Sequence, residues 1–191
     1  LDRFCVGLAD ETWNVSPRMA EGREHLRGMD RKKFNRQKVV PAGIWYDKIK
    51  RPPFKNLPKR QLLFIGDLGR KANFEEILGA VPLISRKING FHFLIVGGGD
   101  REKDFQQIAK QLDVESCVTF TGWVRDRKKL DELIYGSTVG LALYEKYDEN
   151  GNLTFANFSD PGKIKDYLSA GLPVLVSEVP YNAQIIEERK C

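Results

Sequence analysis

Residues 160–176, with the sequence DPGKIKDYLSAGLPVLV, combine a helix start, a charged helix face, a helix stop and a buried strand. Pro161 suits the first helical position, because its missing N–H would have no partner there. The first amides of a helix have no intrahelical acceptor, so those of Gly162, Lys163 and Ile164 can bind an anion. Together with the Lys163 ammonium, these amides predict a phosphate site.

Asp166 lies about one turn after Lys163 on the same predicted helix. Ile164 and Tyr167 belong to the apolar stripe of this helix, and the two charged residues share the neighbouring stripe. Gly171 then ends the helix. The spacing therefore holds an ammonium and a carboxylate side by side at the edge of a buried face.

A second basic loop, GDLGRKANFEE, covers residues 66–76 and precedes another predicted helix. Glycines let the backbone approach an anion, and the guanidinium of Arg70 can donate two parallel hydrogen bonds. With Lys71 beside it, the loop predicts a diphosphate site. An ordinary strand-to-helix turn with solvated charges explains the same residues equally well.

Two further loops follow strands. GGGD, residues 97–100, stands where a dinucleotide fingerprint would stand, but the last glycine of that fingerprint is missing, so no nicotinamide cofactor is expected. A tight turn explains the glycines as well as a ligand does. In the second loop, FTGW, Trp123 and the following Val124 are candidates to present backbone or ring to a nucleotide base, with simple packing as the alternative.

Other chemistries find little support. The sequence shows no Ser-His-Asp or Cys-His arrangement, and it shows no pair of carboxylates suited to glycoside hydrolysis. The three cysteines have no metal-site spacing and do not form an even set, and there are only two histidines. We expect no metal, no cofactor and a reducing, cytoplasmic location.

The elements that position these residues alternate between apolar runs and helical patterns. Strands are predicted at residues 61–66, 91–96, 117–121, 138–144 and 173–177, and helices at 73–85, 101–112, 127–135 and 161–170. This repeat predicts an α/β fold, a Rossmann-like doubly wound parallel sheet. Ligands of such sheets bind at the carboxyl ends of the strands, which is where the candidate loops lie.

Upstream, strands at residues 12–15 and 38–41 flank a helix at 17–27, which makes a partial βαβ segment. We interpret residues 1–47 either as the end of another domain whose earlier part is missing or as an edge added to the main sheet, and we predict that residues 48–60 are a linker. The linker prediction rests on three prolines and six basic residues in KIKRPPFKNLPKR. The net charge of +5 over 191 residues is mild and selects no partner.

The order of the motifs resembles the C-terminal domain of GT-B fold glycosyltransferases, in particular retaining family 4. The motifs are, in chain order, the glycine-containing basic loop, GGG, FTGW and P-x-K-x-x-D-Y-L-x-A-G-L-P-V. The resemblance runs from about Gln61 to the end. It implies that residues 61–191 are a nucleotide-sugar-binding Rossmann-like domain, one half of a GT-B fold truncated at its C-terminus, and that residues 1–47 are the remnant of the N-terminal Rossmann-like domain. It implies transfer of a sugar from a nucleoside-diphosphate sugar with retention and without a metal. The acceptor, a glycan or a lipid-linked sugar, would bind the N-terminal domain. Isolated, the fragment is expected to be inactive.

The resemblance also implies a role for each candidate residue. The donor diphosphate would contact Arg70, Lys71, Gly162 and Lys163, the ribose Asp166, and the base Trp123 and Val124, while Phe158 and Ser159 would lie near the transferred sugar.

Three positions depart from the family pattern. Family members carry two acids eight residues apart, and here these positions are Phe158 and Asp166. A phenyl ring cannot accept the hydrogen bonds of a carboxylate. In the first loop, Asp67 and Ala72 stand where the family has arginine and lysine, so the two cations between them would act from shifted positions.

Two other functions stay open on the sequence. A sugar-nucleotide epimerase shares the two-domain architecture and also binds a diphosphate. A basic module could bind nucleic acid or an anionic membrane surface through residues 31–38, RKKFNRQK, and the linker. Since charge runs are commonly solvated, we expect no nucleic-acid partner, and we keep contact with the inner face of the membrane as an open expectation.

Overall fold

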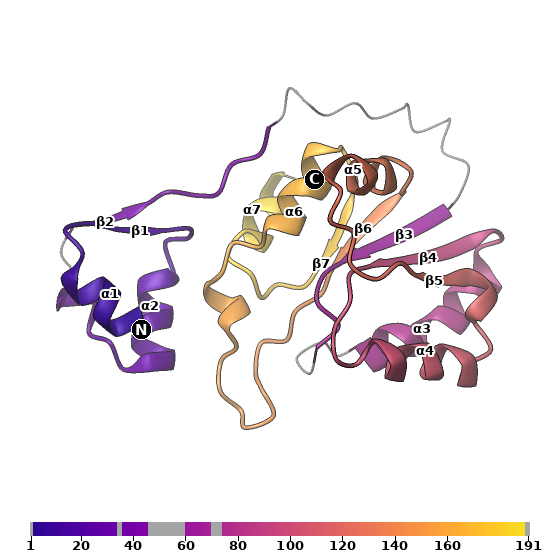
Figure 1. The fold of residues 1–191 in the computed structure, drawn as a ribbon, viewed down its shortest axis with the longest axis horizontal. Helices are drawn as coiled ribbons and strands as arrows, with labels where there is room; N and C mark the ends of the chain where they lie inside the picture. Colours follow the sequence, from indigo (N-terminus) through magenta and orange to yellow (C-terminus); the bar gives the residue numbers. More distant parts are fainter. Residues whose placement is uncertain (1, 34–35, 46–59, 70–73, 190–191) are drawn as a thin grey trace. The chain divides into compact units, whose positions relative to one another are not determined.

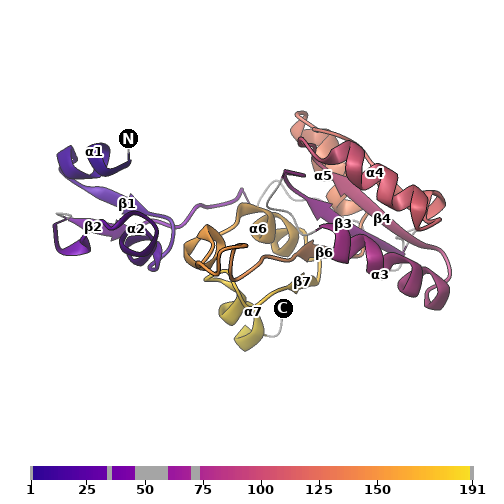
Figure 2. The same cartoon turned by 90° about the horizontal axis from the view of Figure 1, so that it is seen from below.

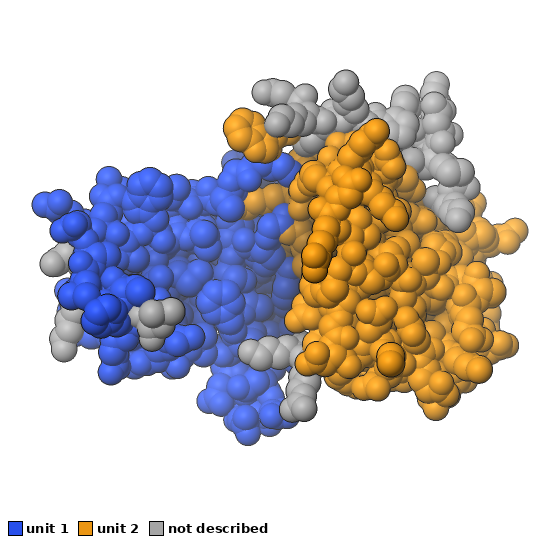
Figure 3. Space-filling model, in the orientation of Figure 1, with its two compact units in different colours: residues 1–44, 143–162, 176–191 blue, residues 45–142, 163–175 orange. Residues whose placement is uncertain are grey.

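The computed structural model describes residues 2–33, 36–45, 60–69 and 74–189. The chain forms two compact units (Figure 3). The first contains residues 1–44, 143–162 and 176–191, and the second contains 45–142 and 163–175. The predicted division at residues 47 and 60 stays a prediction, and the predicted linker lies outside the described residues except for Arg60.

A five-stranded sheet forms the centre of the second unit, in the order β5-β4-β3-β6-β7. Its strands are β3 (Arg60–Ile65), β4 (Phe91–Val96), β5 (Val118–Phe120), β6 (Val139–Ala142) and β7 (Val174–Val176). The ladders that join β3 to β4, β3 to β6 and β4 to β5 are all parallel. The predicted α/β fold with a doubly wound parallel sheet is confirmed, and each predicted strand is present within three residues of its expected ends.

Helices cover both faces of this sheet (Figures 1 and 2). One face carries α3 (Phe74–Lys87) and α4 (Glu102–Gln111), and the other carries α5 (Arg127–Tyr135) and α6 (Gly162–Ser169). Aromatic rings fill the layer beneath α3 and α4, where Phe74 lies 4.7 Å from the ring of Phe64 and 5.2 Å from that of Phe105. Burial of these rings is the main driving force that holds the helices on the sheet. A short 3₁₀ turn, η4 (Glu115–Cys117), leads into β5.

The first unit contains the predicted βαβ segment, with β1 (Thr12–Asn14) parallel to β2 (Gln37–Val39) and α2 (Met19–Arg27) between them. Its other elements are α1 (Asp2–Leu8), α7 (Ala183–Arg189) and the 3₁₀ turns η1 (Arg31–Lys33) and η5 (Phe155–Phe158). The sequence pattern did not predict α1, α7 or η5, because segments of four to seven residues are too short to establish a helical period. Among the described residues, no helix is long and apolar enough to span a membrane.

Candidate functional site

The carboxyl ends of β3 and β6 lie at the point where the strand order reverses, since β4 and β5 extend from one side of β3 and β6 and β7 from the other. The ladder between β3 and β6 ends at the pair Phe64 and Leu141. Beyond it, the hydroxyl of Tyr167 accepts a hydrogen bond from the Ile65 amide at 2.8 Å and donates one to the Leu141 carbonyl at 3.4 Å. This side chain therefore joins α6 to both strands at the switch point.

Gly140 admits the Tyr167 ring. A Cβ at residue 140 would lie 2.4 Å from Cδ2 of that ring, closer than any side-chain contact allows. Tyr167 is fully buried, as is Ile164 one turn earlier. Since both belong to the apolar stripe of α6, they fix its rotation and direct the neighbouring charged stripe towards the strand ends.

Lys163 occupies that charged stripe. Its Nζ lies 4.3 Å from the ring centroid of Phe64, and only 2.7 Å from the position that a Cβ on Gly66 would take. The contact with the ring is a cation–π interaction. Burial lowers the pKa of Lys163 to about 8, because desolvation disfavours the ammonium form. The structure thus places a desolvated cation against the backbone at the carboxyl end of β3, where an anionic ligand would stabilise it.

Asp166, the second charged residue of α6, pairs with α5. Its Oδ1 accepts a hydrogen bond from Nη2 of Arg127 at 2.9 Å, and 21% of its side chain is exposed. Nε of the same guanidinium donates to Oδ1 of Asp131 at 2.7 Å. Sequence reasoning did not select Arg127; its only signal was the i,i+4 spacing to Asp131, which indicates a helix-surface pair.

The glycines after β4 are required by the backbone of the loop after β3. Gly97 has φ +133°, and a Cβ there would lie 1.8 Å from the carbonyl oxygen of Gly66. A Cβ at Gly99 would lie 2.5 Å from the carbonyl carbon of Leu68. The two loops are also joined by a hydrogen bond from the Leu68 amide to the Gly98 carbonyl at 3.0 Å. Close packing against the loop after β3 therefore accounts for glycine at residues 97 and 99, a reason that the sequence did not indicate.

The loop after β5 adds an aromatic side chain. The Gly97 amide donates to the Gly122 carbonyl at 2.9 Å, which joins this loop to the end of β4. Cδ1 and Nε1 of Trp123 both lie 2.9 Å from the position of a Cβ on Gly98, and the tryptophan is 65% exposed. One edge of the indole therefore lies on the glycine backbone, and most of the ring system faces solvent. Val124 follows it and is half-buried.

Four of the remaining predicted residues are Arg70, Lys71, Gly162 and Ser159. Arg70 and Lys71 are outside the described residues. Gly162 is the first residue of α6, and apart from its chain neighbours and the backbone of its own helix no described atom lies within 4 Å of the position that a Cβ there would take. Ser159, in the first unit, donates from its hydroxyl to the Ala156 carbonyl at 3.1 Å.

Phe158 belongs to the first unit and is only 4% exposed. Its carbonyl accepts a hydrogen bond from the buried Ser16 hydroxyl, and its ring centroid lies 5.9 Å from that of His25. A Cβ on Gly22 would lie 2.7 Å from Cγ of this ring, so α2 needs a glycine here. Phe158, which stands where the family has an acid, therefore packs against α2.

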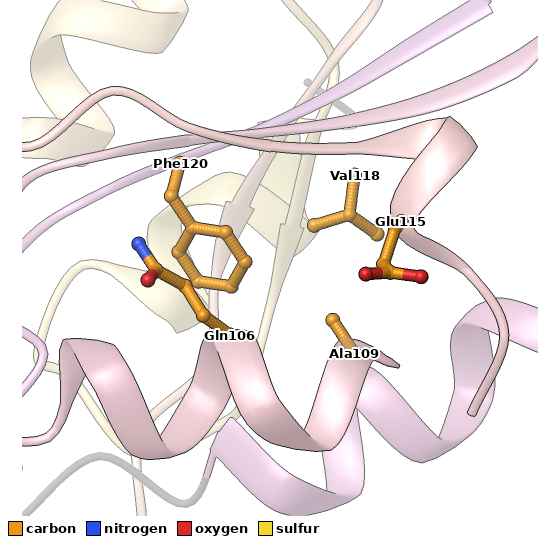
Figure 4. Close-up of a pocket in the computed structure, with 5 residues that line it drawn as sticks. All are labelled: Gln106, Ala109, Glu115, Val118 and Phe120. Carbon is orange, nitrogen blue, oxygen red and sulfur yellow. The ribbon is translucent and has the colours of Figure 1, made fainter. Parts of the chain in front are cut away.

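A shallow pocket of about 250 Å³ lies between α4 and β5, the strand at one edge of the sheet (Figure 4). Gln106 and Ala109 of α4 line one side, and Glu115, Val118 and Phe120 line the other. None of the predicted site residues contributes to it. Within the described ranges, no group of three His, Cys, Asp or Glu side chains could hold a metal ion.

The fold and the strand-end residues define the class: a doubly wound α/β domain that presents a cation and a carboxylate at its topological switch point, where such domains bind nucleotides and related ligands. The comparison with known families is more specific. Residues 59–191 match the family described as Glycosyl transferases group 1, and the chain belongs to this family. The predicted resemblance to family 4 glycosyltransferases of the GT-B fold is confirmed.

Individual relatives are distant in sequence. The chain is 21% identical over 166 residues to alpha-monoglucosyldiacylglycerol synthase of Streptococcus pneumoniae, covering 80% of this chain and 35% of that enzyme. Anabaena Alr3699/HepE, solved with UDP and glucose, has a TM-score of 0.71 at 13% identity, over 95% of this chain and 48% of that one. The pneumococcal O-GlcNAc transferase GtfA, solved with UDP and GlcNAc, has a TM-score of 0.67 at 15% identity, over 92% and 31%. The chain therefore spans between about a third and a half of the length of these three proteins.

Proposed function

We propose that this chain is the donor-binding portion of a retaining glycosyltransferase that uses a nucleoside-diphosphate sugar. The observation that carries the proposal is the Lys163 ammonium, half-buried against Phe64 and Gly66 at the switch point of the sheet. UDP is present together with a sugar in the HepE and GtfA structures, which share this fold, and this supports a nucleotide-sugar donor.

Each part of the donor is assigned to a set of residues. The diphosphate contacts Lys163, the Gly162 amide, Arg70 and Lys71; the ribose contacts Asp166; the base contacts Trp123 and Val124; and the transferred sugar lies near Phe158 and Ser159. The exposed indole face of Trp123 supports the base assignment, because a flat aromatic surface stacks on any base.

Catalysis in this proposal is stabilisation of the leaving group. As the glycosidic bond breaks, negative charge grows on the diphosphate, and a preorganised cation lowers the barrier without rearrangement of solvent. Tyr167 supplies the preorganisation, since its hydroxyl fixes α6 to β3 and β6. We propose that Lys163 and the amides at the start of α6 supply enough positive charge for donor binding without a metal ion, which predicts that EDTA leaves the affinity unchanged.

The acceptor is proposed to be a glycan or a lipid-linked sugar held by an N-terminal domain. The name of the pneumococcal relative, a synthase of a glucosylated diacylglycerol, supports a lipid acceptor. A cytoplasmic location with peripheral contact at the inner membrane face fits such an acceptor, and cell fractionation tests it.

Calorimetric titration of UDP and GDP tests the donor assignment. Lys163→Ala should weaken binding of the preferred nucleotide roughly ten- to hundredfold, the expected effect of losing charge-assisted hydrogen bonds. Lys165→Ala is the matched control, because it removes the same charge two residues further along α6, and it should bind as the unmodified chain does. Equal affinity for the Lys163→Ala variant would overturn the assignment.

Retention is tested separately. A protein that carries this chain and transfers sugar should give a product with the donor's anomeric configuration in proton NMR. A product of inverted configuration would overturn retention and leave the donor site itself intact.

A further inference from the structure

We propose that Arg127 is a positioning residue that holds the Asp166 carboxylate in the orientation that receives the donor ribose. The inference rests on the proposed function, since it takes Asp166 as the ribose-binding group. It adds a residue from α5 that acts on the ligand only through its effect on α6.

The guanidinium of Arg127 donates hydrogen bonds from two of its nitrogens, Nε and Nη2. Arg127 is the first residue of α5, whose N-cap Asp126 accepts a hydrogen bond from the Lys128 amide at 2.9 Å. Nε bonds Asp131 one turn later at 2.7 Å, and Nη2 bonds Asp166 at 2.9 Å. Because the guanidinium is planar and rigid, fixing Nε on α5 also fixes the direction in which Nη2 points. The carboxylate of α6 is thus oriented from a neighbouring helix.

Asp166 can serve both partners. A carboxylate has two oxygens and about four acceptor sites, and the bond to Arg127 uses one site on Oδ1. With 21% of its side chain exposed, Asp166 retains surface that a ligand can reach. A ribose presents two adjacent hydroxyls as donors, and a carboxylate locked in one rotamer loses less side-chain entropy on binding them. Without Arg127, Asp166 would sample several rotamers and bind the hydroxyls less well.

An alternative effect of Arg127 is purely electrostatic. Its removal leaves Asp131 and Asp166 with less positive charge nearby, which would weaken binding of any anionic nucleotide. This effect is the same for UDP and for 2′,3′-dideoxy-UDP, since both carry the same diphosphate. Loss of Asp166 positioning, by contrast, weakens binding of UDP alone, and so it lowers the ratio of the dissociation constant of 2′,3′-dideoxy-UDP to that of UDP.

The test measures that ratio by calorimetry in the 191-residue chain. The unmodified chain should bind UDP roughly ten- to hundredfold more tightly than 2′,3′-dideoxy-UDP, the value of hydrogen bonds to a charged acceptor. In Arg127→Ala the ratio should fall below about three, and in Arg127→Lys it should recover in part. Lys128→Ala, which removes the same charge from the next residue of α5, should keep the full ratio. Thermal unfolding should change little in all three variants, because exposed ion pairs contribute little stability.

A second measurement needs no ligand. Three-bond couplings across χ1 of Asp166 should report a single rotamer in the unmodified chain and in Lys128→Ala, and averaged rotamers in Arg127→Ala. Unchanged couplings in Arg127→Ala would overturn the positioning role, whether or not UDP binds.

The binding results separate the two proposals. A full ratio in Arg127→Ala, or tighter UDP binding in that variant, would overturn the role of Arg127 while Asp166 keeps its assignment. A ratio near one in the unmodified chain would instead remove the ribose assignment of Asp166, and absence of nucleotide binding would remove the proposed function.

Discussion

Donor binding should take up a proton at Lys163 when the pH is near 8. Burial lowers the pKa of this ammonium to about 8 in the free protein, and a bound diphosphate would restore it to at least its ordinary value of about 10.4 by supplying negative charge. The free protein is therefore protonated at Lys163 in about 90% of molecules at pH 7, about 50% at pH 8 and about 10% at pH 9. Since the protonated form binds the anion, the affinity should fall about tenfold between pH 7 and pH 9.

Isothermal titration of UDP in two buffers of different ionisation enthalpy measures this uptake directly. We expect about 0.1 proton taken up per UDP bound at pH 7, about 0.5 at pH 8 and about 0.9 at pH 9, from the difference between the protonated fractions of the free and bound states. At pH 8 and 9 the nucleotide does not interfere, because the second ionisation of a phosphate group lies near pH 6. At pH 7 about 10% of UDP is still protonated, and release of that proton on binding offsets the small uptake at Lys163, so pH 8 and 9 are the decisive conditions.

Lys163→Met is the control, because it removes the titrating group and keeps the apolar stem against Phe64. It should bind UDP weakly with little dependence on pH. The reasoning would be refuted if the unmodified chain bound UDP with constant affinity from pH 7 to 9 and without proton uptake, or if Lys163→Met retained the uptake.

Two substitutions test the architecture of the site by urea unfolding. Gly97→Ala should destabilise the chain by more than about 3 kcal/mol, because its Cβ would meet the Gly66 carbonyl oxygen at 1.8 Å in a left-handed region of φ. Gly79→Ala, in α3, should stabilise the chain by about 0.5–1 kcal/mol, because apart from its chain neighbours and its own helix backbone no described atom lies within 4 Å of the new Cβ. Equal effects of the two substitutions would contradict the packing argument. Tyr167→Phe should lower the free energy of unfolding by about 1–3 kcal/mol, since the Ile65 amide loses its 2.8 Å partner. A variant as stable as the unmodified chain would show that this hydroxyl does not join α6 to the strands at the switch point.

The alternation of strands and helices could be predicted from residue 60 onward because its signal is local. Apolar runs such as FHFLIV at residues 91–96 identify buried strands without reference to the rest of the chain. The helix that carries Lys163 and Asp166 was equally clear, since a proline near its start, an apolar stripe and a glycine at its end are all contained within 160–176. Which charged residues share a turn of α6 also follows from helical periodicity alone.

The partners of those residues depend on contacts between distant segments. Asp166 meets Arg127 across 39 positions and Tyr167 meets Ile65 across 102, so neither pair leaves a periodic signal in the sequence. Strand order and register decide them, because they determine which loops end side by side.

Tertiary packing also determined what two conspicuous features do. The sequence left a ligand or a turn as equal reasons for the glycines of GGG, and the approach of the Gly66 carbonyl to Gly97 adds a packing reason that depends on a distant segment. Phe158 could be recognised from the sequence only as a missing acid, whereas its burial against Gly22 and His25 gives the side chain a structural role. The sequence by itself thus determined the fold class and the charged face of α6, because both arise from short-range periodicity. The tertiary structure decided what each side chain contacts, because those contacts depend on segments that only folding brings together.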